Sequence, residues 1–305
     1  MQNFTSTDIA VLVLELIPAV TVGLAGERIA KAAEQWPRSL RLLLPSLFAL
    51  PYAWISAAHG MFEWKWFGLY AALPVAIAWL LNAAAAADPD QRGNWRDALV
   101  LLSLGLAVDL RWLEPLWPHG LAGLGKLVLV DAGLYGYVVM RQLSGTGFDF
   151  HFRWSDWKTG LRELAFFAPV VIALGLALGF LHPHAHALRP SMPLTWVYIF
   201  VFIAIPEELF FRAWVQNLLE KRLTAPNSHA SPQATRRARI DALIITSILF
   251  GLSHFNKRSA HFNWRYVILA TIAGIFYGRA WRQDRRVPAS AITHASVDAI
   301  WSFWF

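Results

Sequence analysis

The stretch Pro206-Glu207-Glu208-Leu209-Phe210-Phe211-Arg212 places two adjacent carboxylates and a guanidinium inside a segment that is otherwise apolar from Met192 to Leu219. A single charged side chain at the centre of a membrane-spanning helix costs about 2.5 to 3.5 kcal/mol on insertion scales. Such side chains usually face the interior of a helix bundle or a water-filled cavity. Three of them together therefore predict a site inside a helical bundle.

Helical geometry assigns different tasks to the two glutamates. Glu208 and Arg212 are four residues apart, so they lie on one helix face and are expected to form an ion pair. Glu207 points about 100° away from that face and is the carboxylate left over for chemistry. Pro206 has no N–H for the carbonyl of Phe202, which predicts a kink where the carboxylates lie.

The composition of the whole chain agrees with a membrane protein. Among its 305 residues, 56% are apolar and only 15% are charged. We therefore predict an all-α protein, a polytopic transmembrane helical bundle. The chain has no cysteine, which excludes disulfides, thiolate metal sites and a cysteine nucleophile. The formal net charge of +7 is explained by basic residues in the loops. We therefore expect no nucleic-acid partner.

Most of the apolar runs reach or nearly reach the roughly 20 residues that a helix needs to cross about 30 Å of hydrocarbon. The run at residues 97–110 is short and decides between nine and ten spans. The runs lie at about residues 9–26, 41–58, 66–87, 97–110, 121–140, 163–181, 192–219, 240–255, 266–281 and 288–305.

Basic residues are unevenly distributed between alternate loops, and the richer set includes the polar stretch Thr224 to Arg239. The positive-inside rule assigns this set to the cytoplasm. This difference in loop charge exists only if the short run at residues 97–110 crosses the membrane. We therefore favour ten spans, with both termini outside. We expect a multi-pass protein of the bacterial inner (plasma) membrane.

Two runs carry small residues at four-residue spacing, a pattern that lets helices approach closely within a bundle. They are Gly175 with Gly179, and Ala270 with Gly274 and Gly278.

Two further polar pairs follow the glutamates along the chain. Phe250 and His254 lie near the end of one apolar run, and His294 and Asp298 lie in the last, each pair on one helix face. With about 1.5 Å per residue, Glu207 and His254 lie at similar depths, about 18 and 21 Å from the cytoplasmic ends of their runs. His294 lies only about 9 Å deep by the same arithmetic, a difference that Pro288 or a tilted last helix would make up.

The three motifs Glu-Glu-x-x-x-Arg, Phe-x-x-x-His and His-x-x-x-Asn/Asp, in this order on apolar segments, resemble the signature of the CAAX-protease and bacteriocin-processing (CPBP or Abi) family of intramembrane peptidases. The resemblance covers about residues 192–305. It suggests an accessory transmembrane region at residues 1–160, followed by a protease domain at residues 161–305.

The resemblance implies proteolysis by a helical bundle, with catalytic positions at Glu207, His254, His294 and Asp298. Glu208, Arg212 and Phe250 would support the site. Relatives often have Asn at the last position. An ionised Asp cannot donate a hydrogen bond to an oxyanion, so holding the His294 imidazole in one tautomer suits Asp298 better.

The residue types themselves fit the activation of water. Glu207 would act as general base toward a water that His254 also holds, while His294 stabilises the oxyanion or protonates the leaving amine. The same Glu207, His254 and His294 would equally make a zinc site with an open position for water. We favour metal-free catalysis by the glutamate, with no cofactor.

The expected partners are membrane lipid and a protein or peptide substrate, with or without a lipid anchor. A prenylated CAAX-type C-terminus, a leader peptide and a C-terminal sorting tail all remain open. The rival hypothesis is a proton-coupled transporter or channel, because further charges lie in apolar runs; these are Glu15, Asp109, Lys126 and Asp131. An inert membrane scaffold is a third reading.

Overall fold

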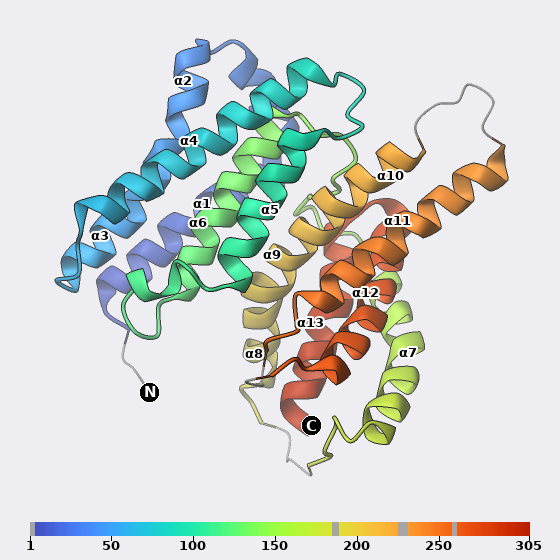
Figure 1. Ribbon diagram of the computed structural model, residues 1–305. Helices are drawn as coiled ribbons and strands as arrows, with labels where there is room; N and C mark the ends of the chain where they lie inside the picture. The colour runs from blue at the N-terminus through green and yellow to red at the C-terminus, as the bar shows by residue number, and fades with distance from the viewer. Residues whose placement is uncertain (1–3, 185–188, 225–230, 258–260) are drawn as a thin grey trace. The chain divides into compact units, whose positions relative to one another are not determined.

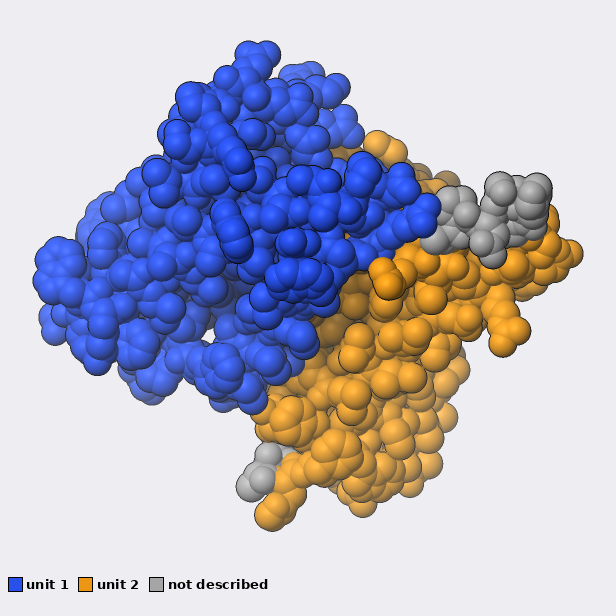
Figure 2. All heavy atoms as spheres, turned by 45° about the horizontal axis from the view of Figure 1, so that its top comes forward, with its two compact units in different colours: residues 1–144 blue, residues 145–305 orange. Residues whose placement is uncertain are grey.

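The computed structural model describes residues 4–184, 189–224, 231–257 and 261–305, and these contain helices and no strand (Figure 1). The predicted all-α class is therefore confirmed. The chain divides into two compact units, residues 1–144 and residues 145–305, which Figure 2 shows in different colours. The sequence-based boundary between residues 160 and 161 falls inside a helix of the second unit, and as a division by function it stays a prediction.

The first unit contains six α-helices with short 3-10 and π segments between them. Its elements are α1 Ser6–Glu34, α2 Arg38–Leu43, the 3-10 segment η1 Leu44–Ala49, α3 Leu50–Ala58, α4 Trp64–Ala87, α5 Trp95–Asp109, the 3-10 segment η2 Glu114–Leu116, α6 Gly123–Leu134 and the π segment η3 Tyr135–Met140.

The second unit holds all three motifs. Its elements are α7 Trp154–Ala177, α8 Met192–Ile199, the π segment η4 Phe200–Ala204, α9 Ile205–Glu208, the π segment η5 Leu209–Gln216, α10 Asn217–Leu223, α11 Pro232–Leu252, α12 Trp264–Asp284 and α13 Val287–Trp304.

Six helical stretches are long and apolar enough to cross a membrane: Ser6–Glu34, Arg38–Ala58, Trp64–Ala87, Gly123–Met140, Trp154–Ala177 and Met192–Leu223. Three more helices, α11, α12 and α13, have 21, 21 and 18 residues. The short run forms α5, whose 15 residues extend only about 22 Å at 1.5 Å per residue. The protein is thus a multi-pass membrane protein, and the choice between nine and ten spans stays a prediction.

The polar stretch Thr224 to Arg239 is only partly a loop, because α11 begins at Pro232. The Ser231 side chain accepts a hydrogen bond from the backbone N–H of Ala234, and proline at the first position of a helix loses no bond. Residues 225–230 lie outside the described part of the chain.

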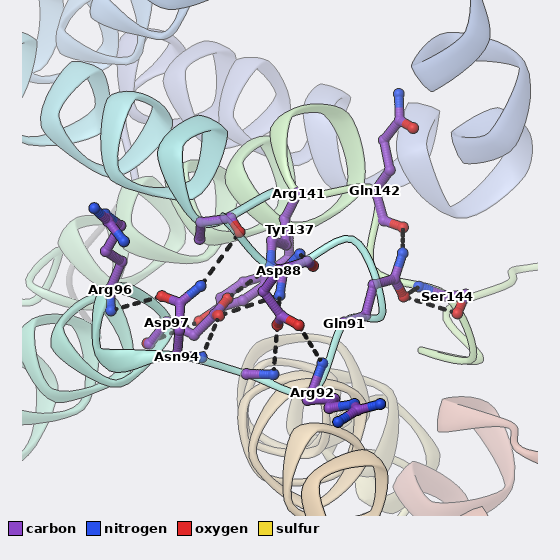
Figure 3. A network of polar contacts seen from close by, with 12 residues as sticks. Asp88, Gln91, Arg92, Asn94, Arg96, Asp97, Tyr137, Arg141, Gln142 and Ser144 are labelled. Carbon is purple, nitrogen blue, oxygen red and sulfur yellow. Dashed lines mark hydrogen bonds and ion pairs between the residues drawn. The ribbon is translucent and has the colours of Figure 1, made fainter. Parts of the chain in front are cut away.

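A buried arginine joins the ends of α4, α5 and η3 within the first unit (Figure 3). The Arg141 side chain is 1% exposed and lies 2.6 Å from Asp88 and 3.0 Å from Asp97. Burial tends to raise the pKa of Asp88, but hydrogen bonds from the Arg92 backbone, Arg141 and the Gly93 backbone outweigh it and hold this pKa below its usual value. The cluster fixes the connection that follows α4.

Close helix contacts in the second unit bring α11, α12 and α13 together. A Cβ atom on Gly274 would lie 3.0 Å from Ser247 Cα, and one on Gly251 would lie 1.9 Å from Thr271 Oγ1. The predicted packing role of Gly274 is confirmed. Gly179 is different: it lies just beyond the end of α7 with φ of +60°, so it terminates this helix instead of packing against a neighbour.

The start of α13 is anchored inside the protein. Arg286 lies 2.6 Å from Asp156 in the first turn of α7 and 2.7 Å from Asp149, and it donates to the His151 carbonyl. Burial tends to raise the pKa of Asp149, but hydrogen bonds from Arg286 and His151 lower it to about 2. Val287, the next residue, is fully buried, so α13 begins within the packed bundle.

Candidate active site

One long helical stretch from α8 to α10 carries both glutamates. Glu207 and Glu208 lie in the short helix α9, with the π segments η4 before it and η5 after it. The sequence predicted a kink at Pro206; the structure has wider turns on both sides of that residue. π-Helical turns are rare and frequently lie at functional sites.

The expected ion pair between Glu208 and Arg212 is present. The Arg212 Nε atom lies 2.8 Å from Glu208 Oε2, and both side chains are fully buried. Ser290 of α13 also donates a hydrogen bond to Glu208 Oε2. The Arg212 guanidinium lies over the Phe250 ring, 5.2 Å from its centroid. Glu208 of α9 is therefore linked to α13 through Ser290.

His294 lies among three carboxylates. Its Nδ1 atom is 2.8 Å from Glu208 Oε1, while Nε2 is 3.5 Å from Asp298 Oδ2 and 3.9 Å from Glu207 Oε2. Its ring stacks on Tyr277 at 4.6 Å. Glu208 makes the shorter contact and thus orients the imidazole, a role that the sequence analysis assigned to Asp298.

The structure brings His294 close to Glu207, although the depth arithmetic places His294 nearer the cytoplasmic end. The arithmetic assumed that every apolar run starts at the membrane surface. Because α13 starts inside the bundle, at the buried Val287, a count of residues from its first turn underestimates the depth of His294.

His254 lies at the end of α11 and is 6% exposed. Its Nδ1 atom is 2.8 Å from the Phe250 carbonyl oxygen, which can only accept a hydrogen bond, so Nδ1 carries the proton. In the neutral ring Nε2 is then an acceptor, and the Lys257 ammonium lies 3.4 Å from it.

Phe250 lies between the two histidines, and its supporting role stays a prediction. Its ring centroid lies 4.9 Å from that of His254 and 5.8 Å from that of His294, and it is 2% exposed. The motif residues thus form one continuous cluster in the second unit, with Glu207, Glu208, His294 and Asp298 in direct proximity and His254 joined through Phe250.

Three participants were not found from the sequence: Lys257, Tyr277 and Ser290. Lys257 follows an apolar run and was interpreted as a loop charge, although its position three residues after His254 was a usable signal. Its Nζ atom lies 3.8 Å from Glu207 Oε1. Tyr277 and Ser290 are ordinary members of buried helices, and no sequence signal distinguishes them.

An apolar pocket opens beside the cluster. Its empty space totals about 710 Å³, including the part that is open to the outside. His254, His294 and Asp298 supply polar groups to its wall. Aromatic and aliphatic side chains of α7, α12, α13 and the segment after α7 make up most of the rest, among them Phe167, Phe180, Leu269, Ala273, Val297 and Trp301.

The predicted zinc ligands Glu207, His254 and His294 do not form a metal site as they are placed. Within the described residues no three His, Asp or Glu side chains are arranged to hold a metal ion. His254 Nε2, the nitrogen that remains for a ligand bond, faces the positively charged Lys257. In this arrangement the three side chains do not converge on one point, and the zinc site stays a prediction.

The charges that suggested a transporter lie in the first unit. Glu15 and Asp131 are buried, 2% and 3% exposed, and both carboxylate oxygens of Glu15 lack a hydrogen-bond partner. Lys126 is paired with Glu114 at 3.5 Å. These residues belong to a different unit from the three motifs and do not contribute to the motif cluster.

Comparison with known proteins agrees with the motif cluster. Residues 189–300 match the family model described as "Type II CAAX prenyl endopeptidase Rce1-like". The curated proteins and the solved structures contain no match to the chain. The matched segment includes Glu207, His254, His294 and Asp298. Residues 189–300 of this multi-pass membrane protein are thus similar to the Rce1-like CAAX prenyl endopeptidases, a family of peptidases.

Proposed function

We propose that the second unit is an intramembrane endopeptidase in which Glu207 activates water to hydrolyse a peptide bond. The observation that carries the proposal is the approach of Glu207 Oε2 to His294 Nε2, 3.9 Å, because His294 also lines the open apolar pocket. Motif residues distant in sequence thereby supply a base and a proton carrier to one point.

In the proposed reaction, a water molecule lies between the Glu207 carboxylate and the Nε2 lone pair of His254. Glu207 takes a proton as the water oxygen attacks the scissile carbonyl. The C–N bond then breaks, and the proton passes to the leaving amine from Glu207 directly or through His294. Asp298, 3.5 Å from His294 Nε2, keeps a second acceptor beside this nitrogen. A positioned acid or base of this kind contributes about 10²- to 10⁴-fold in rate.

The apolar pocket favours a lipidated substrate. Ligand pockets are lined mostly by hydrophobic and aromatic side chains, and the walls of this pocket suit an isoprenoid chain. A prenylated CAAX-type C-terminus could place its lipid in this pocket with its peptide bond near Glu207. This substrate is our preferred one, ahead of a leader peptide or a sorting tail, and the bacterial plasma membrane is our proposed location.

The test uses the full chain in lipid nanodiscs and a farnesylated peptide ending in a CAAX sequence, with mass spectrometry of the released C-terminal peptide. We expect cleavage by the wild type and a loss of at least about 100-fold in Glu207→Gln, which keeps the shape of the side chain. Glu27→Gln, on the exposed side of α1, is the control and keeps full activity. Cleavage by Glu207→Gln at the wild-type rate would refute the role of Glu207.

A further inference from the structure

Lys257 is a cation at the edge of the motif cluster. It follows the end of α11, three residues after His254, and its side chain is 32% exposed, whereas His254 and His294 are buried. Its Nζ atom lies 3.4 Å from His254 Nε2 and 3.8 Å from Glu207 Oε1. The ammonium therefore lies beside both groups between which the attacking water is placed.

The hydrogen-bonding capacity of this ammonium is only partly used by these neighbours. A lysine ammonium has three N–H donors. One is directed to His254 Nε2, whose single lone pair accepts because Nδ1 donates to the Phe250 carbonyl; in the proposed reaction the water takes over this lone pair and releases that donor as well. A second lies near the Glu207 carboxylate. A third donor remains for a substrate atom at this position.

Arg212, another cation of the cluster, cannot donate a hydrogen bond to a substrate atom. The Arg212 guanidinium is fully buried and bound to Glu208, behind the Phe250 ring. Negative charge that develops on a carbonyl oxygen next to Glu207 would be repelled by that carboxylate unless a cation compensates it. Among the described residues, Lys257 is a cation that lies 3.8 Å from Glu207 and is also partly exposed.

We propose that Lys257 is a further catalytic residue, whose ammonium donates a hydrogen bond to the scissile carbonyl oxygen as it becomes an oxyanion. The inference rests on the proposed peptidase reaction. The water oxygen bonds to the carbonyl carbon, Glu207 takes the water proton, and the negative charge on the carbonyl oxygen is compensated by Lys257. When the C–N bond breaks, that charge returns to form the C=O bond, the amine takes the proton, and Lys257 keeps all of its own protons.

This assignment gives a catalytic site that needs no metal to stabilise the oxyanion. Removal of one such donor in hydrolases typically costs about 10²- to 10³-fold in kcat. A donor that acts only on the transition state changes kcat and leaves KM nearly unchanged.

The experiment compares Lys257→Met and Lys257→Arg with the wild type in the nanodisc assay, using the farnesylated CAAX peptide. We expect kcat to fall about 100- to 1,000-fold in Lys257→Met, with KM changed less than about threefold. Lys257→Arg keeps a positive donor and should recover part of this loss. Arg265→Met is the control, because it removes a positive charge from an exposed site where the guanidinium lies over Trp264.

Three results would overturn the proposal: an unchanged kcat in Lys257→Met, a higher KM with unchanged kcat, or a loss of activity explained by a lower unfolding temperature. ¹⁵N NMR of labelled histidine provides a readout without substrate. The Nε2 resonance of His254 should move in Lys257→Met and stay in place in Arg265→Met, and an unmoved resonance contradicts the contact. If the wild type leaves the peptide intact while the resonance moves, the proposed substrate fails and the contact stands.

Discussion

His294 Nδ1 lies 2.8 Å from Glu208 Oε1, which makes the second glutamate of the pair the residue that orients the imidazole. The same carboxylate binds Arg212 through its other oxygen, so one side chain fixes both a cation on its own helix and a histidine on α13. Glu207 is thereby free of this structural task. The neighbouring glutamates divide the work between support and chemistry.

Glu208→Gln is predicted to lower both stability and activity. An amide leaves Arg212 without a charge partner in a fully buried position, and breaking a buried ion pair from one side costs about 3 to 5 kcal/mol. Thermal unfolding in detergent should show a clear decrease in midpoint, together with a lower yield of folded protein. Glu207→Gln is the matched comparison and should unfold like the wild type; equal behaviour of the two variants would contradict the division of work.

His254→Gln separates a metal mechanism from a metal-free one. If His254 holds water, the glutamine side chain should retain measurable hydrolysis, and strong chelators should leave the wild type active. A zinc ligand behaves differently, since its loss removes metal and activity together. Metal analysis of both purified proteins checks this, and stoichiometric zinc that disappears along with activity would disprove the metal-free mechanism.

Asp149 should make stability depend on pH in the acid range. Its pKa is about 2 in the folded protein, below the reference value of 3.8, because the hydrogen bonds from Arg286 and His151 outweigh burial. The ionised group therefore stabilises the fold above the reference pKa, and this contribution is lost as pH falls through about 2. Unfolding midpoints between about pH 6 and about pH 2 should fall less steeply in Asp149→Asn than in the wild type, and parallel curves would contradict the clamp.

Glu15→Gln combined with Asp131→Asn is predicted to stabilise the first unit. Two carboxylates buried near each other, one without a hydrogen-bond partner, are costly in an apolar bundle. We expect the unfolding midpoint to rise by about 2 to 4 °C for each kcal/mol recovered. The exposed Asp90→Asn is the control and should change nothing. A lower midpoint in the double variant would instead indicate that the two carboxylates bind a cation.

Topology reporters test the number of spans. A reporter inserted in the loop before Pro232 should read cytoplasmic, and one fused after Phe305 should read external. Reporters on the same side would mean that one apolar run, α5 first among the candidates, does not cross.

The sequence was sufficient for contacts within one helix and insufficient for contacts between helices. The four-residue spacing of Glu208 and Arg212 predicted their ion pair, because helical periodicity fixes which side chains share a face. The bond from Glu208 to His294 depends on how α13 packs, which no local pattern records. Lys257 was missed for a related reason, since a charge after an apolar run is usually a loop charge. The boundary between the two compact units, at residues 144 and 145, also depends on packing. The amino-acid composition does not change there, so the sequence does not indicate this boundary.

The π turns of η4 and η5 imply that the α8–α10 segment is sensitive to length as well as to side-chain identity. One residue of an α-helix corresponds to a rotation of about 100°. Deleting a single residue between Leu209 and Gln216 while the wide turns stay unchanged would rotate the residues beyond the deletion by about that angle relative to the two glutamates. A change of one residue in the length of this segment therefore alters how the residues beyond it align with the two glutamates.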